Sequence, residues 1–158
     1  MSITINTKIN GQAVTAMADA STSLLEFLRD TLEMKGSKLC CNTGECGACT
    51  VIYDGKPINS CVTMAADANG AEITTIEGLA NGDKLHPVQQ AFIDTGAVQC
   101  GYCTPGFIMS VKALFDRTKK PTAQDIEEAI SGNICRCTGY NKIVDAIHLA
   151  ADRIAGRA

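Results

Sequence analysis

Hydrophobic and polar residues alternate in short runs along the first half of the chain. A period of two is typical of strands that bury one face. Between the first two runs, Asn10-Gly11 favours a type I′ hairpin turn. Strands are therefore expected at residues 3–9, at residues 12–17, on both sides of an Asp-Gly turn in residues 49–62, and within residues 71–79.

One stretch of this half, residues 21–36, has a helical pattern instead. Ser23 and Glu26 have the spacing of a capping box, and Gly36 is expected to end the helix. The apolar face of this helix consists of Leu24, Leu25, Phe27, Leu28 and Leu32. Strands around a single helix predict a small β-grasp-like domain over residues 1–79.

In the second half, from about residue 80, apolar positions recur at helical spacing. We expect the domain junction near residues 79–83 and helices at residues 87–99, 105–117, 122–131 and 141–156. Pro87 and Pro105 suit the first turn of a helix, and Thr122 suits a cap. The last helix has one apolar stripe, formed by Ile143, Val144, Ile147, Ala150, Ala151 and Ile154. Four helices with short connections predict an all-α four-helix bundle over residues 80–158, which makes the fold class α+β.

Composition and charge narrow the possible functions. The chain has 158 residues and a formal net charge of -3, without a run of Lys or Arg. It therefore lacks the basic patch that is typical of nucleic-acid binding. The start of the chain lacks a signal-peptide pattern, and no run approaches the ~18 apolar residues of a membrane span. These features predict a cytoplasmic protein without membrane insertion. In that compartment thiols stay reduced, and clustered cysteines indicate metal or redox chemistry.

Four of the nine cysteines lie in "KLCCNTGECGACTV", residues 38–51. The pattern Cys41-x4-Cys46-x2-Cys49, completed by Cys61 beyond a strand pair, is the plant-type [2Fe–2S] spacing. Cys40 would give a gap of five residues, so we assign it as the spare. Such a loop must wrap the cluster and aim backbone N–H groups at the sulfurs. Small residues leave room for this close approach: Gly44, Gly47 and Ala48.

The other four cysteines form a second candidate site in the helical half. Cys100-x2-Cys103 spans the gap between the first two helices, and Cys135-x-Cys137 lies between the last two. Helix ends in a bundle can converge on one point, so these thiols can bind a second metal group. The nine cysteines then divide into two sets of four and one spare.

Other interpretations of the cysteines are weaker. Two structural zinc sites would also use four thiolates each, but the C-x4-C-x2-C loop favours iron–sulfur, and Cys-x-Cys is unusual in zinc ribbons. A disulfide scaffold would require an export signal. His86 and His148 lie in separate helices and do not form the His pair of a Rieske centre. The sequence also lacks a catalytic nucleophile pattern, a paired-carboxylate site and a phosphate-binding glycine loop, so no catalytic residue is assigned.

A family resemblance adds to these observations. "TGECGACTV" with Cys61, "QCGYCTPG" and "GNICRCTGY" together resemble the iron–sulfur subunits of the xanthine dehydrogenase family, the molybdenum hydroxylases. The paired motifs scarcely occur outside this family, and the resemblance covers residues 3 to about 154. It implies a ferredoxin-type domain followed by a helical domain, each with one [2Fe–2S] cluster. Cys40 is a departure, because many relatives carry Gly there.

The resemblance also implies a function for the chain within a larger complex. Electrons would pass from a molybdopterin centre in a large subunit through the two clusters, and usually on to FAD in a medium subunit. Gln99 and Cys137 would approach the edge of the pterin, although Gln99 could also simply cap a helix end. Because the chain stops soon after the last helix, we expect the other parts on separate chains. Purines or related N-heterocycles are the preferred substrates, with nicotinate-like compounds, aldehydes, aromatic acyl-CoA and carbon monoxide as alternatives. A free-standing ferredoxin carrier and a zinc-stabilised interaction module are alternatives of other classes.

Overall fold

A five-stranded sheet organises the first half of the computed structural model, which describes residues 1–157. The strands follow the order β2-β1-β5-β3-β4, and only β1 and β5 pair in parallel. Their bounds are β1 Ser2–Ile9, β2 Gln12–Asp19, β3 Thr50–Tyr53, β4 Lys56–Asn59 and β5 Glu72–Thr74. The expected strands are all present, although β5 is shorter than the pattern indicated.

Both expected hairpin turns are confirmed by their backbone angles. Asn10 and Gly11 have φ values of 51° and 81°, and Asp54 and Gly55 have values of 45° and 78°. Positive φ at both central residues is the requirement of a type I′ turn, whose twist matches that of the flanking strands. The register of β1 with β2 and of β3 with β4 therefore follows from local sequence.

The helix of this half begins as expected but ends early. Ser23 and Glu26 form the capping box, and α1 (Leu24–Glu26) continues directly into a π-helical segment, η1 (Phe27–Thr31). The expectation that Gly36 ends the helix is wrong, because the chain leaves the helix at Leu32 and Glu33 takes the left-handed conformation. Gly36 is instead a packing position, where an added Cβ would lie 2.3 Å from the Ile76 side chain.

The core of the first half lies between this helix and the sheet. Three short 3-10 helices, η2 (Ser60–Val62), η3 (Ala65–Ala68) and η4 (Ile76–Gly78), connect the remaining strands. The buried residues that meet there include Ile5, Ile9, Leu24, Phe27, Leu28, Val51 and Ile73. The mixed sheet with its covering helix matches a [2Fe–2S] ferredoxin-like fold.

Four helices form the second half: α2 (Pro87–Asp94), α3 (Thr104–Arg117), α4 (Ala123–Ile130) and α5 (Asn141–Ile154). Pro87 and Pro105 lie in first turns, and Thr122 caps α4 through a capping box with Asp125. His86 caps α2 through its ring nitrogen, which confirms its interpretation as a helix-start residue. The first helix ends at Asp94 rather than at residue 99, because Gly96 takes a positive φ of 68°.

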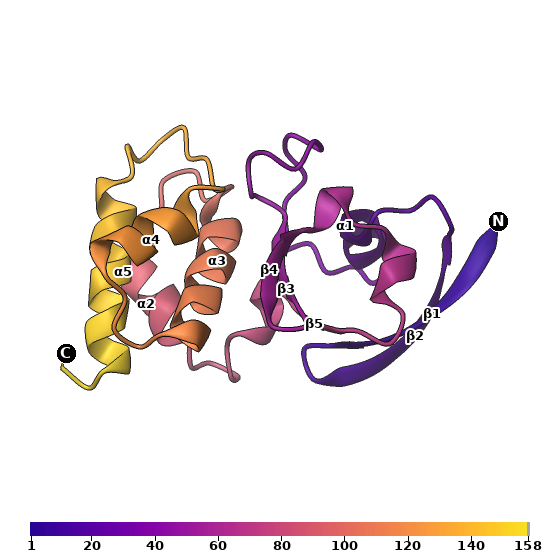
Figure 1. Cartoon of the computed structure of the whole chain (residues 1–158), viewed down its shortest axis with the longest axis horizontal. Coiled ribbons are helices and arrows are strands. Elements are labelled where there is room, and N and C mark those ends of the chain that lie inside the picture. The colour runs from indigo at the N-terminus through magenta and orange to yellow at the C-terminus, as the bar shows by residue number, and fades with distance from the viewer. Residues whose placement is uncertain (158) are drawn as a thin grey trace.

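The helices share one core and pack on the sheet through α3. Buried residues from all four helices form a single cluster that includes Val88, Phe107, Ile126 and Ile147. Met109 and Ala113 of α3 contact Ile52 of β3, so the two halves lie against each other, as Figure 1 shows. Of the helices within residues 1–157, none has both the length and the apolarity needed to cross a membrane.

Candidate functional site

The structure gathers Cys41, Cys46, Cys49 and Cys61, here called the first thiol set, at one end of the sheet. The first three lie on the loop that leads into β3, and Cys61 lies in η2, just beyond β4. Cys46, Cys49 and Cys61 are buried, and Cys41 is partly exposed. Cys49 and Cys61 pack with Leu25 of α1, so the helix forms one wall of the site.

Backbone amides of this loop point at the sulfurs, as the motif requires. The amides of Thr43 and Cys46 lie 3.4 Å and 3.5 Å from Cys41 Sγ. The amide of Gly44 reaches the Cys61 sulfur, and that of Ala48 reaches Cys46. Gly44 and Gly47 have φ values of 81° and 68°, which a residue with a side chain rarely adopts. The small residues of the motif therefore serve the tight turn of the loop.

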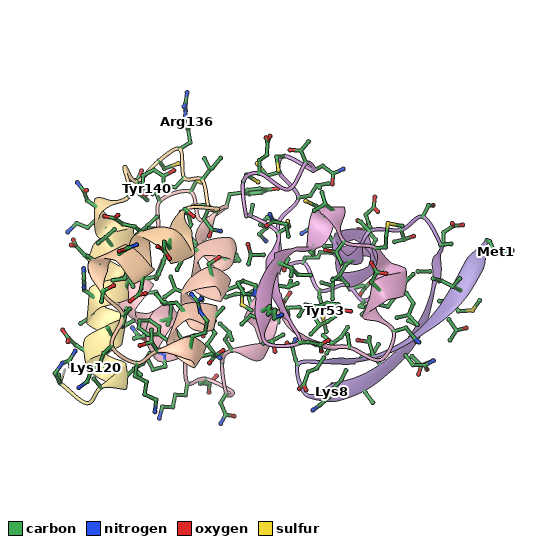
Figure 2. The ribbon with its side chains drawn as sticks, viewed as in Figure 1. Met1, Lys8, Tyr53, Lys120, Arg136 and Tyr140 are labelled. Carbon is green, nitrogen blue, oxygen red and sulfur yellow. The ribbon has the colours of Figure 1, made fainter. Side chains whose placement is uncertain are left out.

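The second thiol set, Cys100, Cys103, Cys135 and Cys137, lies where helix ends meet. Cys103 is the N-cap residue of α3, Cys100 lies in the α2–α3 connection, and the other two lie between α4 and α5. All four line one cavity of about 180 Å³. Cys100 and Cys137 are exposed, whereas Cys135 is buried. In Figure 2 the loop that carries Arg136 projects beyond the helix ends.

Within each set the thiols lie close enough to influence one another. In the first set the neighbouring Cys41 thiol acts to raise the pKa of Cys46, and the Cys49 thiol acts to raise that of Cys61. In the second set the Cys100 and Cys137 sulfurs are 3.6 Å apart, and the neighbouring Cys135 thiol helps to raise the pKa of Cys103. A [2Fe–2S] cluster takes four thiolates, two on each iron, and each set supplies four thiols. The donor set therefore fits two [2Fe–2S] clusters.

The polar surroundings stabilise one thiolate in each set. The hydroxyl and amide of Thr43 lower the pKa of Cys41 to about 5. Burial raises the pKa of Cys135, but the hydroxyl of Thr138, at 3.0 Å from the sulfur, and its amide outweigh this effect and lower it. Burial dominates at two other thiols and raises their pKa, to about 11 at Cys61 and about 12 at Cys103. Iron binds thiolates, so the donors around Cys41 and Cys135 favour the form that binds metal.

The two cysteine loops touch each other. The amide of Ile134, next to Cys135, donates to the carbonyl of Cys46 at 2.9 Å. The side chain of Asn133 donates to the carbonyl of Gly47 at 3.1 Å. These contacts connect residues that are far apart in the sequence and place the two thiol sets on adjoining loops. No local sequence pattern indicates either hydrogen bond.

Two residues singled out from the sequence have unexpected positions. Cys40 is exposed and lines the cavity of the second thiol set, although its neighbour Cys41 belongs to the first. The Tyr102 hydroxyl donates to the carbonyl of Leu39 and holds this segment beside the second set. Gln99 is exposed next to Cys100 and lies beyond the end of α2, so it does not cap that helix.

Comparison with known families gives two matches that together span most of the chain. A model described as "2Fe-2S iron-sulfur cluster binding domain" matches residues 7–76. A second, described as "[2Fe-2S] binding domain", matches residues 75–148. Each match contains one complete thiol set.

Individual proteins extend this similarity over nearly the whole chain. The chain is 46% identical over 153 residues to the nicotinate dehydrogenase small FeS subunit of Eubacterium barkeri, covering 97% of this chain and 98% of that one. It superposes on a chain of quinoline 2-oxidoreductase from Pseudomonas putida 86 with a TM-score of 0.93, at 36% identity, covering 98% and 97% of the two chains. Against aldehyde oxidoreductase from Desulfovibrio desulfuricans the TM-score is 0.94 at 43% identity, but the match covers only 17% of that chain.

Proposed function

Because the chain belongs to the xanthine dehydrogenase family of molybdenum hydroxylases, as an iron–sulfur subunit, we propose which of its residues carry that function. It is an electron-transfer subunit with two [2Fe–2S] clusters, and it forms part of an oxidoreductase. We assign residues 1–79 to a ferredoxin-type domain and residues 80–158 to a four-helix-bundle domain. The two family matches, which meet at residues 75–76, support this division.

The ligands of the first cluster are Cys41, Cys46, Cys49 and Cys61, and those of the second are Cys100, Cys103, Cys135 and Cys137. The observation that carries this assignment is that the fold gathers each set of four thiols: the second set lines one cavity, with the Cys100 and Cys137 sulfurs 3.6 Å apart, and backbone amides point at the sulfurs of the first set. Cys40 does not have the spacing of the first set, and we assign it as the spare rather than as a ligand. The spacing of the first set and the amides directed at its sulfurs agree with this choice.

The clusters supply one-electron chemistry, and the protein governs where and how easily it occurs. Hydrogen bonds to the sulfurs stabilise negative charge and so favour the reduced state. Thr43 acts in this way in the first set and Thr138 in the second. Burial of Cys49 and Cys61 by Leu25 keeps water from that side of the first set. The contact between the two cysteine loops provides a short connection for electrons between the sets.

The second thiol set faces the molybdopterin-bearing large subunit. The support comes from exposure, because Cys100 and Cys137 are accessible whereas Cys46, Cys49 and Cys61 are buried. Gln99 offers an amide that both donates and accepts hydrogen bonds beside this pair, which suits the edge of a pterin ring together with Cys137. The first set then delivers electrons to FAD in a medium subunit or to another acceptor.

We assign the complex to the cytoplasm.

The substrate of the complex is an N-heterocycle. The support is that two of the relatives are named for such compounds, nicotinate and quinoline. The match to an aldehyde oxidoreductase makes aldehydes the main competing class. The substrate pocket belongs to the large subunit, so this chain contributes no residue to the choice.

Anaerobic reduction of the purified complex tests this function. Nicotinate, xanthine and an aldehyde are added separately, and the visible absorption of the oxidised clusters is followed. We expect bleaching with a heterocycle and co-purification of a molybdenum-containing large chain. Bleaching by the aldehyde alone would reassign the substrate class. An oxidised protein that no substrate reduces, although the large chain is bound, would contradict the electron path.

A further inference from the structure

Asn133 is a buried polar residue whose hydrogen bond joins the two halves of the molecule. Its side chain is 4% exposed, and its Nδ2 atom donates to the carbonyl of Gly47 at 3.1 Å. The next residue, Ile134, donates its amide to the carbonyl of Cys46. Two adjacent donors of the second cysteine loop therefore bind two adjacent carbonyls of the first.

The acceptor at Gly47 is held from several sides. Its carbonyl also accepts the Thr50 hydroxyl at 2.7 Å and the Thr50 amide at 3.2 Å. On the side of α3, a Cβ added to Gly106 would lie 2.1 Å from this same oxygen. A Cβ added to Gly47 would lie 2.4 Å from Asn133 Nδ2. The loops thus meet in a contact that has no room for a methyl group.

We propose that Asn133 is a positioning residue that fixes the separation of the two clusters and so controls electron transfer between them. The inference rests on the proposed function, because it needs a cluster in each thiol set. Electron transfer between two centres slows steeply as their separation grows. A hydrogen bond that ties the two loops at the residue next to Cys46 is well placed to prevent such growth.

If Asn133 had only a structural role, its substitution would have a different measurable effect. Loss of a buried hydrogen bond would then lower the stability of the chain and leave the geometry between the clusters unchanged. A positioning role predicts a change in the magnetic interaction between the two reduced clusters. This interaction falls with the inverse cube of their separation, so it reports distance and does not depend on turnover.

The experiment compares variants of the complex, reduced fully with dithionite and examined by EPR. Asn133→Ala removes the donor, and Gly106→Ala places a methyl group against the Gly47 carbonyl from the side of α3. Asn59→Ala is the matched control, because Asn59 Nδ2 also donates to a loop carbonyl, that of Gly44 at 2.5 Å, but within the first half. Iron content and the EPR signals of partly reduced samples show whether each cluster is intact.

We expect Asn133→Ala and Gly106→Ala to keep both clusters but to lose much of the splitting caused by their interaction. Substrate-driven reduction of the first cluster should slow in the same two variants, and Asn59→Ala should keep the wild-type splitting. Unchanged splitting in Asn133→Ala, with both clusters present, would overturn the proposal and leave the electron-transfer function intact. Loss of the second cluster from Asn133→Ala would overturn it too, because Asn133 would then serve the cluster itself. Absence of clusters from the wild-type chain would instead contradict the proposed function.

Discussion

The two thiol sets meet the same requirement with different backbones. The first set takes three thiols from one loop and one from a nearby 3-10 helix, and the loop and α1 bury most of it. The second set takes its pairs from two connections between helices and leaves Cys100 and Cys137 exposed. A wrapping loop directs several backbone amides at the sulfurs and leaves little of them exposed. Converging helix ends leave part of the thiol set exposed to a partner. The comparison shows why the second set suits contact with a partner.

The largest expected effect concerns Cys41 and its neighbour. Cys41→Ser should lose the first cluster, about two of four irons, because an oxygen replaces one of its four thiolate ligands. Cys40→Ser is the matched control, one residue away, and should keep both clusters. Iron content and EPR separate the results. Loss of the ferredoxin-like signal from Cys40→Ser, with Cys41→Ser intact, would reverse the assignment of the spare cysteine.

A smaller effect is expected at the exposed edge of the second set. Gln99→Ala should leave iron content and both EPR signals unchanged but slow substrate-driven cluster reduction about fivefold, the equivalent of one hydrogen bond of about 1 kcal/mol. The measurement is stopped-flow bleaching in the assembled complex. Wild-type rates together with wild-type cofactor occupancy would show that Gln99 has no part in docking.

The smallest expected effect is on the reduction potential and concerns a group that donates a hydrogen bond to a cysteine sulfur. Thr138→Val removes the hydroxyl that donates to Cys135, so the potential of the second cluster should fall by roughly 40 mV, about 1 kcal/mol for one electron. Thr138→Ser should restore it, and the potential of the first cluster should stay at its wild-type value in both variants. Redox titration followed by EPR measures both potentials. Equal shifts of both clusters in Thr138→Val would contradict the separate tuning of the two sets.

Local patterns predicted most of the backbone that holds the thiols. The Asn10-Gly11 and Asp54-Gly55 turns, the Ser23–Glu26 capping box and the Thr122 cap were predicted because each depends on residues close together in sequence. The spacing of the first thiol set has the same local origin. The second set required the further assumption that helix ends converge, and the structure does bring its thiols around one cavity.

What the sequence could not predict depends on contacts between distant residues. Gly36 resembled a helix end, but its small size serves the packing against Ile76. Cys40 adjoins the first set in the sequence, yet its segment is held beside the second set by Tyr102. The Asn133–Gly47 hydrogen bond joins residues separated by 86 positions, and no local pattern contains such information.

The most direct test of two clusters in one chain is a joint count of metal and sulfide. The chain, purified anaerobically under mild conditions, should contain about four iron atoms and four acid-labile sulfides, two of each for every [2Fe–2S] cluster. EPR of the reduced protein should resolve two distinct signals, one for each thiol set. Stoichiometric zinc without sulfide would contradict the account, and so would a protein that binds only two irons when both thiol sets are intact.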